Sequence, residues 1–324
     1  MVSLVKVTLV MPVHGDAPFL DETLISISKI DYFDHDTHII LDRSSLKVKA
    51  KVEKFKTEQE NVVIHESNRP GIVAALNLGI EKSKAQFIAR IDSDDLICSN
   101  RLALQVKYLE SNPDVSIVGT QLLLINELGE PIGKSHYPET DSDLRKLLKY
   151  QNCIAHPSVM FRKSHFLESG KYREHFNGAE DYDLWMRMSR LGKLHTINQP
   201  LTHYRKSINQ HSKNIQFNQR VIENSVRLAA YGVNPFPVTE TSKYGLEEMK
   251  NLNIKAFSTL KSKDKRVAQE YKCIQIIDKL YRVRSVESGI KRFLSALPVL
   301  LQAATVDLTT LINFIQLKRK FSND

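Results

Sequence analysis

The chain has 324 residues, of which 42% are hydrophobic and 26% charged, and its formal net charge is +9. These values are typical of a soluble globular protein that holds one large domain and an appendage. The three cysteines, Cys98, Cys153 and Cys273, are far apart and lack the spacing of metal ligands, which indicates a reducing compartment. The first residues show no signal-peptide pattern, so we expect a cytoplasmic protein.

Positive charge is concentrated near the C-terminus. Residues 1–240 hold 30 lysines and arginines against 29 acidic residues, whereas residues 241–324 hold 16 against 8. A stretch with the composition of a loop, 231–237, comes just before this change. We therefore predict a first domain at 1–215 and a basic, mostly helical region at 216–324, which suits an anionic surface or an acidic partner.

Apolar runs with two different periods alternate along the first 190 or so residues. Short β-branched runs predict strands at Val5–Met11, His38–Leu41, Val62–His65, Phe87–Ile91 and Val115–Val118. Helical spacing predicts helices at Asp21–Ile30, Gly71–Lys82, Arg101–Glu110 and Tyr182–Leu191. Strands and helices that alternate in this way predict an α/β fold, in which helices cover both faces of a mostly parallel sheet.

Three carboxylates, Asp92, Asp94 and Asp95, directly follow the fourth predicted strand. The carboxyl ends of strands are where open α/β sheets bind ligands. Like charges packed there favour a bound cation, and Mg²⁺ or Mn²⁺ prefers oxygen ligands and often joins a carboxylate to a phosphate. The alternative is a solvated turn that caps the next helix, because serine and aspartate, including Ser93, are good capping residues.

Other residues fall at the same predicted edge of the sheet. Pro12 stops the first strand, and Asp42 follows the second, where it suits either a bound base or ribose or an ordinary turn. Arg69 precedes a helix that begins at Gly71 and whose N-terminal amides suit a phosphate. A loop and an amphipathic helix with no ligand are the alternative.

In this order, the motifs resemble the inverting glycosyltransferases of family 2, which have the GT-A fold. The resemblance covers about residues 4–212 and is carried by Leu9–Val13, Ile39–Asp42, Asn68–Ile80, Asp92–Asp95, His156–Arg162 and Gly178–Arg187. It implies a Rossmann-like, mostly parallel sheet. It also implies transfer of a hexose or hexosamine from a nucleotide diphosphate sugar, with UDP as the expected nucleotide. The expected acceptor is a hydroxyl of a glycan or lipid-linked molecule in surface polysaccharide synthesis.

The resemblance also assigns roles on the donor side. Asp42 is expected to bind the base. Asp94 is expected to hold Mg²⁺ or Mn²⁺ on the diphosphate, and Asp92 to contact the ribose or the coordination shell of the metal. Asp95 is expected to support these two or to cap the following helix. The other expected contacts of the nucleotide sugar are Pro12, Val13, Arg69 and Ser93.

An inverting transfer needs a base that takes the proton from the acceptor hydroxyl. The resemblance assigns this role to Asp181, with Glu180 as the second candidate. Two acids at the start of a helix are also what the helix dipole favours. The resemblance places His156 and Trp185 on the acceptor side, against the alternatives of a packed histidine and a core tryptophan. Asp183 diverges from Asp181 at about 100° per residue, so we expect it to be solvated or structural.

Two positions depart from the family pattern. Arg43 follows Asp42 where related sequences often have a second acid, which changes the expected contacts of the base and ribose. Ser207 stands where many relatives have a histidine that completes the metal or phosphate site. The alternatives for that function are His203, His211, or Arg205 with Lys206.

Residues 293–317 hold 16 apolar residues and no lysine or arginine, and the basic residues Lys318–Lys320 follow. The length of the segment 293–317 suits a membrane span, but Pro298 and Asp307 interrupt its apolar run. A helix lying in the plane of an anionic membrane is therefore the preferred interpretation, and a helix packed on another helix of the tail or on a partner subunit is the alternative. The protein would then be peripheral on the cytoplasmic face of the plasma membrane.

The patterns of rival functions are absent from the sequence. The first strand is not followed by the Gly-x-Gly-x-x-Gly of dehydrogenases, and no P-loop occurs. The near-neutral first domain has no recognition module, so we expect no nucleic acid. The remaining alternative is a member of the same fold that binds nucleotide sugars without turnover. The retained Asp94 and Asp181 argue against that alternative.

Overall fold

The computed structural model describes residues 5–206, 222, 223, 226 and 227. The 293–317 segment and the positions of Ser207 and His211 lie outside the described residues, as does nearly all of 216–324. The boundary at 215 therefore stays a prediction. Within the part of the chain that the structure describes, no helix has the length and apolar character needed to cross a bilayer.

A sheet of nine strands forms the centre of the described chain. The strands are β1 (Val7–His14), β2 (His35–Asp42), β3 (Val62–Glu66), β4 (Phe87–Arg90), β5 (Leu96–Ile97), β6 (Val115–Ile125), β7 (Pro131–Lys134), β8 (Met160–Arg162) and β9 (Lys193–Arg205). The α-helices are α1 (Leu20–Ile27), α2 (Leu46–Glu58), α3 (Ile72–Lys82), α4 (Arg101–Ser111), α5 (Asp141–Leu148), α6 (Lys163–Glu168) and α7 (Glu180–Met188). Two short 3₁₀ helices are η1 (His156–Ser158) and η2 (Glu174–Phe176).

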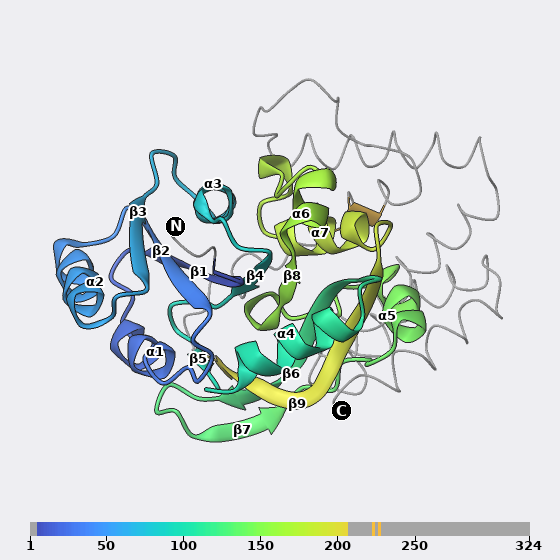
Figure 1. Ribbon diagram of the computed structural model, residues 1–324, viewed down its shortest axis with the longest axis horizontal. Helices are drawn as coiled ribbons and strands as arrows, with labels where there is room; N and C mark the ends of the chain where they lie inside the picture. Colours follow the sequence, from blue (N-terminus) through green and yellow to red (C-terminus); the bar gives the residue numbers. More distant parts are fainter. Residues whose placement is uncertain (1–4, 207–221, 224–225, 228–324) are drawn as a thin grey trace, which may run out of the picture. The chain divides into compact units, whose positions relative to one another are not determined.

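The strands follow the order β3-β2-β1-β4-β8-β6-β9-β5, and β7 pairs with β6 (Figure 1). The first four are parallel to one another, as are β6 and β9. The short strand β8 runs antiparallel to both β4 and β6 and so joins the two parallel parts. The mostly parallel α/β sheet expected from the sequence is confirmed.

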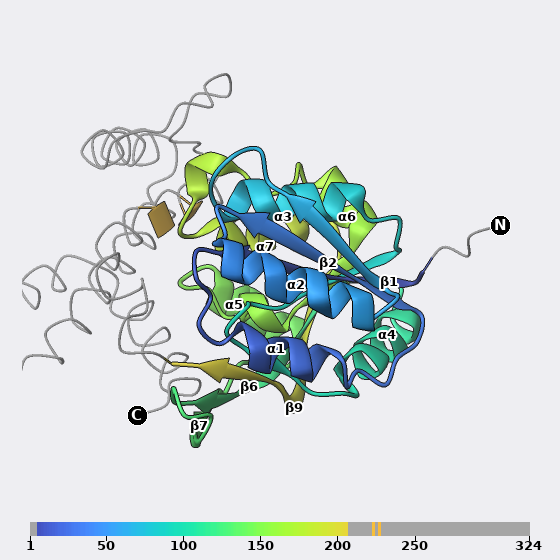
Figure 2. The ribbon, with the colours of Figure 1, turned by 90° about the vertical axis from the view of Figure 1, so that its left-hand side faces the viewer.

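Helices cover both faces of this sheet (Figure 2). Alternate strand residues such as Leu9 and Ile39 face a core shared with α1, α2 and α4. The opposite face carries α3, where a Cβ atom on Gly79 would lie 2.5 Å from Ile40 Cδ1 and 3.0 Å from Val10 Cγ1. The absence of a side chain at Gly79 thus lets α3 pack closely on β1 and β2.

Several elements have weak sequence patterns for physical reasons. The lysine-rich helix α2 buries only three residues, Val48, Val52 and Phe55, so its apolar pattern is weak. Strand β9 is polar and contains Pro200, which the sheet accommodates at shifts in its register with β6. The helix predicted from Tyr182 begins at Glu180, so both acids of the pair are helical.

Arg101 joins elements from distant parts of the chain. Its guanidinium is fully buried and donates to the backbone oxygens of Pro157 at 2.8 Å, Arg90 at 2.8 Å and Val159 at 3.1 Å. It also donates to the Thr202 hydroxyl at 3.1 Å. Burial lowers the pKa of Arg101 to about 9. The side chain therefore ties the end of β4 to η1 and β9 beneath the acidic residues.

Arg101→Met is expected to lower the free energy of unfolding by about 3–5 kcal/mol, because several buried carbonyl groups lose their donor. Urea unfolding followed by circular dichroism measures this change. Lys107→Met, on the exposed side of the same helix, is the matched control and should change stability by less than about 0.5 kcal/mol. Equal effects of the two substitutions would show that the Arg101 contacts do not stabilise the fold.

Candidate functional site

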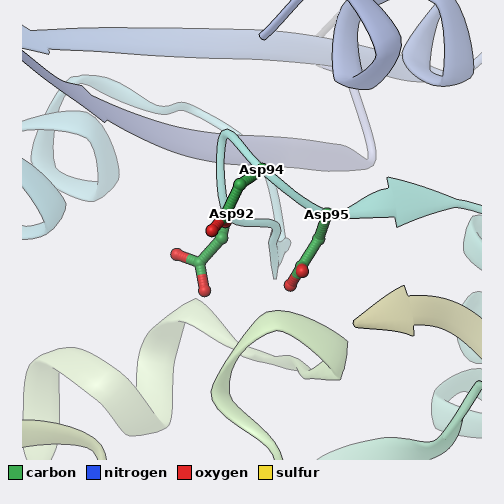
Figure 3. A group of neighbouring side chains, drawn as sticks. All are labelled: Asp92, Asp94 and Asp95. Carbon is green, nitrogen blue, oxygen red and sulfur yellow. The ribbon is translucent and has the colours of Figure 1, made fainter. Parts of the chain in front are cut away.

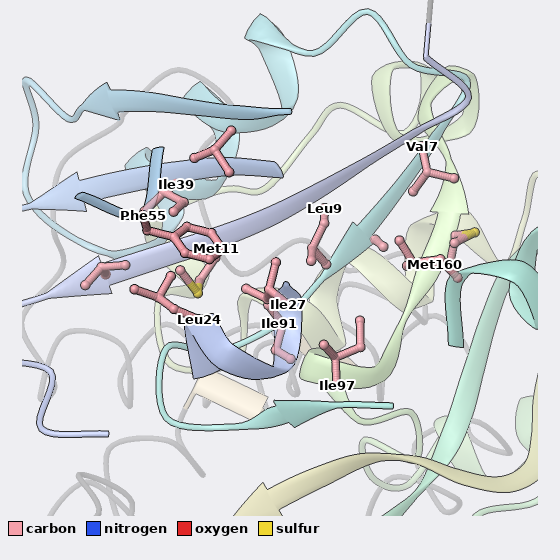
Figure 4. Close-up of a cluster of buried hydrophobic side chains, with 14 of the residues drawn as sticks. Val7, Leu9, Met11, Leu24, Ile27, Ile39, Phe55, Ile91, Ile97 and Met160 are labelled. Carbon is pink, nitrogen blue, oxygen red and sulfur yellow. The ribbon is translucent and has the colours of Figure 1, made fainter. Parts of the chain in front are cut away.

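The three aspartates after β4 form a compact cluster of carboxylates. One oxygen from each of Asp92, Asp94 and Asp95 lies within 4.8 Å of the others (Figure 3). The loop closes through a hydrogen bond from the amide of Asp95 to the carbonyl of Asp92 at 3.3 Å. Its two ends, Ile91 and Ile97, are anchored in the hydrophobic core (Figure 4). The sheet and the core thus hold all three acids at one strand end.

Arg205, at the end of β9, fixes this loop from the other side. Its backbone amide donates to Asp95 Oδ1 at 2.9 Å, and its Nε donates to the carbonyl of Asp94 at 2.9 Å. The guanidinium is fully buried and also bonds Glu22 at 2.7 Å. Arg205 is therefore not placed to bind phosphate, because its side chain supports the loop and has no exposed surface. Lys206 is exposed.

Asp95 does not cap the following helix, contrary to one expectation. Helix α4 begins at Arg101, its N-cap residue is Asn100, and no side chain caps it. Asp95 is instead fully buried behind the other two acids, and its Oδ2 has no hydrogen-bond partner among the described residues. A buried carboxylate oxygen without a partner is costly, so the supporting role is the one that fits its position.

The charges of the cluster fit a divalent cation. Burial, and then the charge of Asp92, raises the pKa of Asp94 to about 6. Burial and both neighbouring acids raise the pKa of Asp95 well above its ordinary value. Arg90, buried beneath the loop, donates to Asp92 but does not neutralise the set. An all-oxygen set of ligands with excess negative charge is what Mg²⁺ or Mn²⁺ prefers.

Binding of Mn²⁺ is expected to weaken as the pH falls through about 6. The metal binds the deprotonated carboxylate, and the pKa of Asp94 is raised to about 6, so protons compete with the metal below that pH. Affinity should be nearly constant above about pH 7 and should fall up to about tenfold per pH unit below 6 for each proton displaced. Electron paramagnetic resonance of free Mn²⁺ measures this affinity at each pH. Equal affinity at pH 5 and pH 7.5 would contradict the expectation.

Glu180 and Asp181 form the second acidic group, at the start of α7. Glu180 Oε2 accepts from the amide of Gly178 at 2.7 Å, and burial together with Asp181 raises the pKa of Glu180 to about 7. Asp181 Oδ1 accepts from the amide of Tyr182 at 2.7 Å, and Oδ2 accepts from Asn152 at 2.6 Å. Burial raises the pKa of Asp181. Both groups can therefore exchange a proton nearer neutral pH than an exposed carboxyl can.

Asp183 takes no part in this pair. It is buried and forms ion pairs with Arg173 and, at 2.6 Å, with Arg187. Arg187 also donates to the carbonyl of Lys171 at 2.7 Å. These contacts fix α7 against the loop before η2. Asp183 is therefore structural and not solvated, the second of the two possibilities expected from the sequence.

His156 and Trp185 lie behind the acidic pair. His156 is buried, its Nε2 shares a hydrogen bond with the Tyr172 hydroxyl at 2.8 Å, and its Nδ1 lies 3.8 Å from Glu180 Oε1. Trp185 is fully buried, and its Nε1 donates to the carbonyl of Ile154 at 3.3 Å. The expectation that Trp185 faces the acceptor is corrected, because the buried ring offers an acceptor no surface.

The donor-side residues lie along the ends of β1 and β2. Asp42 is buried, and its carboxylate accepts from the amide of Gly71 at 2.9 Å and from Arg43 at 3.2 Å. Burial alone would raise the pKa of Asp42, but these donors outweigh it and the pKa is lowered. Arg43 thus binds the acid that it follows. Arg69 is largely exposed and pairs with Glu174 at 2.9 Å.

The remaining predicted residues differ in what they can present to a ligand. Val13 is fully buried, and its carbonyl accepts from the Ser44 hydroxyl at 2.9 Å, whereas Pro12 and Ser93 are partly exposed. His203, on β9, lies 3.6 Å from the sulfur of Cys98 through its Nε2. Val13 therefore shapes the strand end from within the core.

The family model described as glycosyltransferase like family 2 matches residues 7–223. The O-antigen biosynthesis glycosyltransferase WbnJ of Escherichia coli is 38% identical over 183 residues, which are 56% of this chain and 71% of WbnJ. The amylovoran biosynthesis glycosyltransferase AmsE of Erwinia amylovora is 32% identical over 131 residues, 40% of this chain and 48% of AmsE.

Solved structures show the same fold. S. aureus TarS 1–349 in complex with UDP-GlcNAc has a TM-score of 0.58 at 15% identity, over 83% of this chain and 86% of that chain. Mannosyltransferase PcManGT from Pyrobaculum calidifontis, in complex with GDP-Man and Mn²⁺, has a TM-score of 0.53 at 15% identity, over 98% and 85% of the two chains. These likenesses confirm the GT-A fold. The match of the family model over most of the chain shows that the protein belongs to glycosyltransferase like family 2.

Proposed function

We propose that the protein is a metal-dependent inverting glycosyltransferase of surface polysaccharide synthesis. The observation that carries the proposal is the presence of two acidic groups, each with one buried and at least one partly exposed carboxylate, that both act on the guanidinium of Arg90. Burial lowers the pKa of Arg90, but the charges of Asp92 and Glu180 are among those that raise it overall. One group has the ligands for a cation, and the other has proton-accepting carboxylates.

The donor we propose is a nucleotide diphosphate sugar that carries a hexose or hexosamine, with UDP as the nucleotide. Asp42 would bind the base, and Pro12, Val13, Arg69 and Ser93 would lie along the donor. Asp94 and Asp92 would hold Mg²⁺ or Mn²⁺, which when bound neutralises the charge of the departing diphosphate. Two proteins of the same fold support this class of donor, because TarS was solved in complex with UDP-GlcNAc and PcManGT in complex with GDP-Man and Mn²⁺.

The acceptor we propose is a hydroxyl of a glycan or lipid-linked molecule. Asp181 would take the hydroxyl proton while the acceptor oxygen bonds to the anomeric carbon. The bond from that carbon to the phosphate oxygen breaks, and the nucleoside diphosphate leaves with the electron pair. Attack from the face opposite the leaving group inverts the anomeric centre. The names of the relatives, which specify O-antigen and amylovoran biosynthesis, support a surface polysaccharide as product.

A screen of nucleotide sugars with Mn²⁺ or Mg²⁺ tests the proposal through release of the nucleoside diphosphate. Turnover is expected with one sugar donor, only in the presence of the metal, and it should rise when the correct acceptor is added. A protein that binds a donor tightly and releases no diphosphate with any donor or metal would be the non-catalytic member of the fold. That outcome would overturn the proposal.

The cytoplasmic location, the contact of 293–317 with the cytoplasmic face of the plasma membrane and the absence of nucleic acid partners stay predictions. The first is consistent with the biosynthetic glycosyltransferases to which the chain is similar. The second concerns residues outside those that the structure describes.

A further inference from the structure

Asn152 contacts the carboxylate to which the proposed function assigns the proton transfer. Its Nδ2 lies 2.6 Å from Asp181 Oδ2, and the two residues are 29 positions apart in the chain. The other oxygen of Asp181 accepts from the amide of Tyr182 at 2.7 Å. One oxygen is thus held from within α7 and the other by a side chain from the loop that precedes η1, so rotation of the carboxylate is restricted.

The orientation of the Asn152 amide follows from its second contact. Its Oδ1 accepts from the backbone amide of Ile154 at 3.3 Å, so the NH₂ group is the end that faces Asp181. An NH₂ group only donates, and it donates better to an ionised carboxylate than to a protonated one. The contact therefore favours the form of Asp181 that can accept a proton.

We propose that Asn152 is a positioning residue that holds Asp181 ionised and in one orientation for the acceptor hydroxyl. This inference rests on the proposed function, since it requires Asp181 to be the base. It adds a residue that belongs to no sequence block assigned to the site. Asn152 does not itself touch the reacting atoms in this scheme; it acts through Asp181.

Other charged and titratable groups also act on Asp181. Arg90, on β4, lowers its pKa, whereas Glu180 precedes it on α7 and interacts with it electrostatically. Tyr137 and Tyr172 have pKa values raised by burial and, to a lesser degree, by Asp181, so both are neutral near pH 7. The test therefore substitutes Asn152, whose neutral side chain donates to Asp181.

The experiment compares Asn152→Leu and Asn152→Ala with the wild-type protein across pH 5 to 9. Leucine keeps the branched shape of asparagine but has no donor, and alanine is the smaller variant if leucine does not fold. Asn112→Leu is the matched control, because Asn112 donates its amide at 2.8 Å to the carbonyl of Tyr108, at the end of α4. Thermal unfolding checks that each variant is folded.

The acidic limb of the kcat profile is expected to move up by about one to two pH units in both Asn152 variants. At a pH below the limb, kcat should fall about 10- to 100-fold, and it should recover towards the wild-type value at high pH. The KM for the donor and the affinity for Mn²⁺ should not change. A loss of packing alone would lower kcat equally at every pH, so recovery at high pH supports the positioning role.

Two outcomes overturn the inference, and they are distinguishable. If the wild-type protein turns over, and the Asn152 variants either keep its pH profile or lose activity equally at every pH, only the role of Asn152 is contradicted. If the wild-type protein releases no nucleoside diphosphate with any donor, the proposed function fails and the role of Asn152 fails with it. Asn112→Leu should match the wild-type profile in the first case.

Discussion

Asp94→Asn is expected to lower kcat by about 10²- to 10⁴-fold, because the charge of the departing diphosphate would no longer be neutralised through this carboxylate. Asparagine keeps the size of the side chain but removes the negative charge that holds the metal. The apparent dissociation constant for Mn²⁺ should therefore rise at least about tenfold. Diphosphate release under saturating donor measures kcat, and paramagnetic resonance measures metal binding.

The matched control for this substitution is Asp114→Asn, which removes a carboxylate from the surface pair between Asp114 and Lys193. That pair is exposed, so its loss should leave kcat and Mn²⁺ affinity unchanged. Asp94→Asn with wild-type affinity for Mn²⁺ would show that the metal is held elsewhere. Asp94→Asn with normal turnover would show that the cluster does not take part in catalysis.

Asp181→Asn is expected to lower kcat by about 10²- to 10⁴-fold through a different step, because the acceptor hydroxyl loses its base. The affinity for Mn²⁺ and the KM for the donor should stay within about twofold of wild type, which separates this variant from Asp94→Asn. In the wild-type protein, activity should fall as the pH falls through the raised pKa of Asp181, since only the ionised carboxylate accepts a proton.

Glu180→Gln distinguishes the two acids of the pair. If Asp181 is the base, this variant should keep more activity than Asp181→Asn at every pH. Greater loss in Glu180→Gln than in Asp181→Asn would assign the proton transfer to Glu180.

The positions of the acids could be predicted because they depend on local features of the chain. Asp42 and Asp92 come at the ends of apolar, β-branched runs, and parallel strands bring their carboxyl ends to one edge of the sheet. The order of these runs was sufficient to place them. The helical spacing of Trp185 likewise indicated a core position, and that indication was better than the acceptor role taken from the resemblance.

The side chains that support the acids could not be predicted, because their contacts join distant parts of the chain. Asn152 and Asp181 are 29 residues apart, and Arg101 bonds Thr202 across 101 residues. Neither residue has a sequence pattern of its own. Arg90 did carry a signal, since an arginine within a buried strand needs a partner, and its partner is Asp92.

The hydrogen bond between Asp95 and the backbone of Arg205 has a consequence for folding during synthesis on the ribosome. The two residues are 110 positions apart, so the acidic loop leaves the ribosome long before the strand end that fixes it. During that interval the nascent chain has the carboxylates without the bond that holds them. Competence for the metal should therefore arise late in translation, when β9 joins β6, and not when the acids themselves emerge.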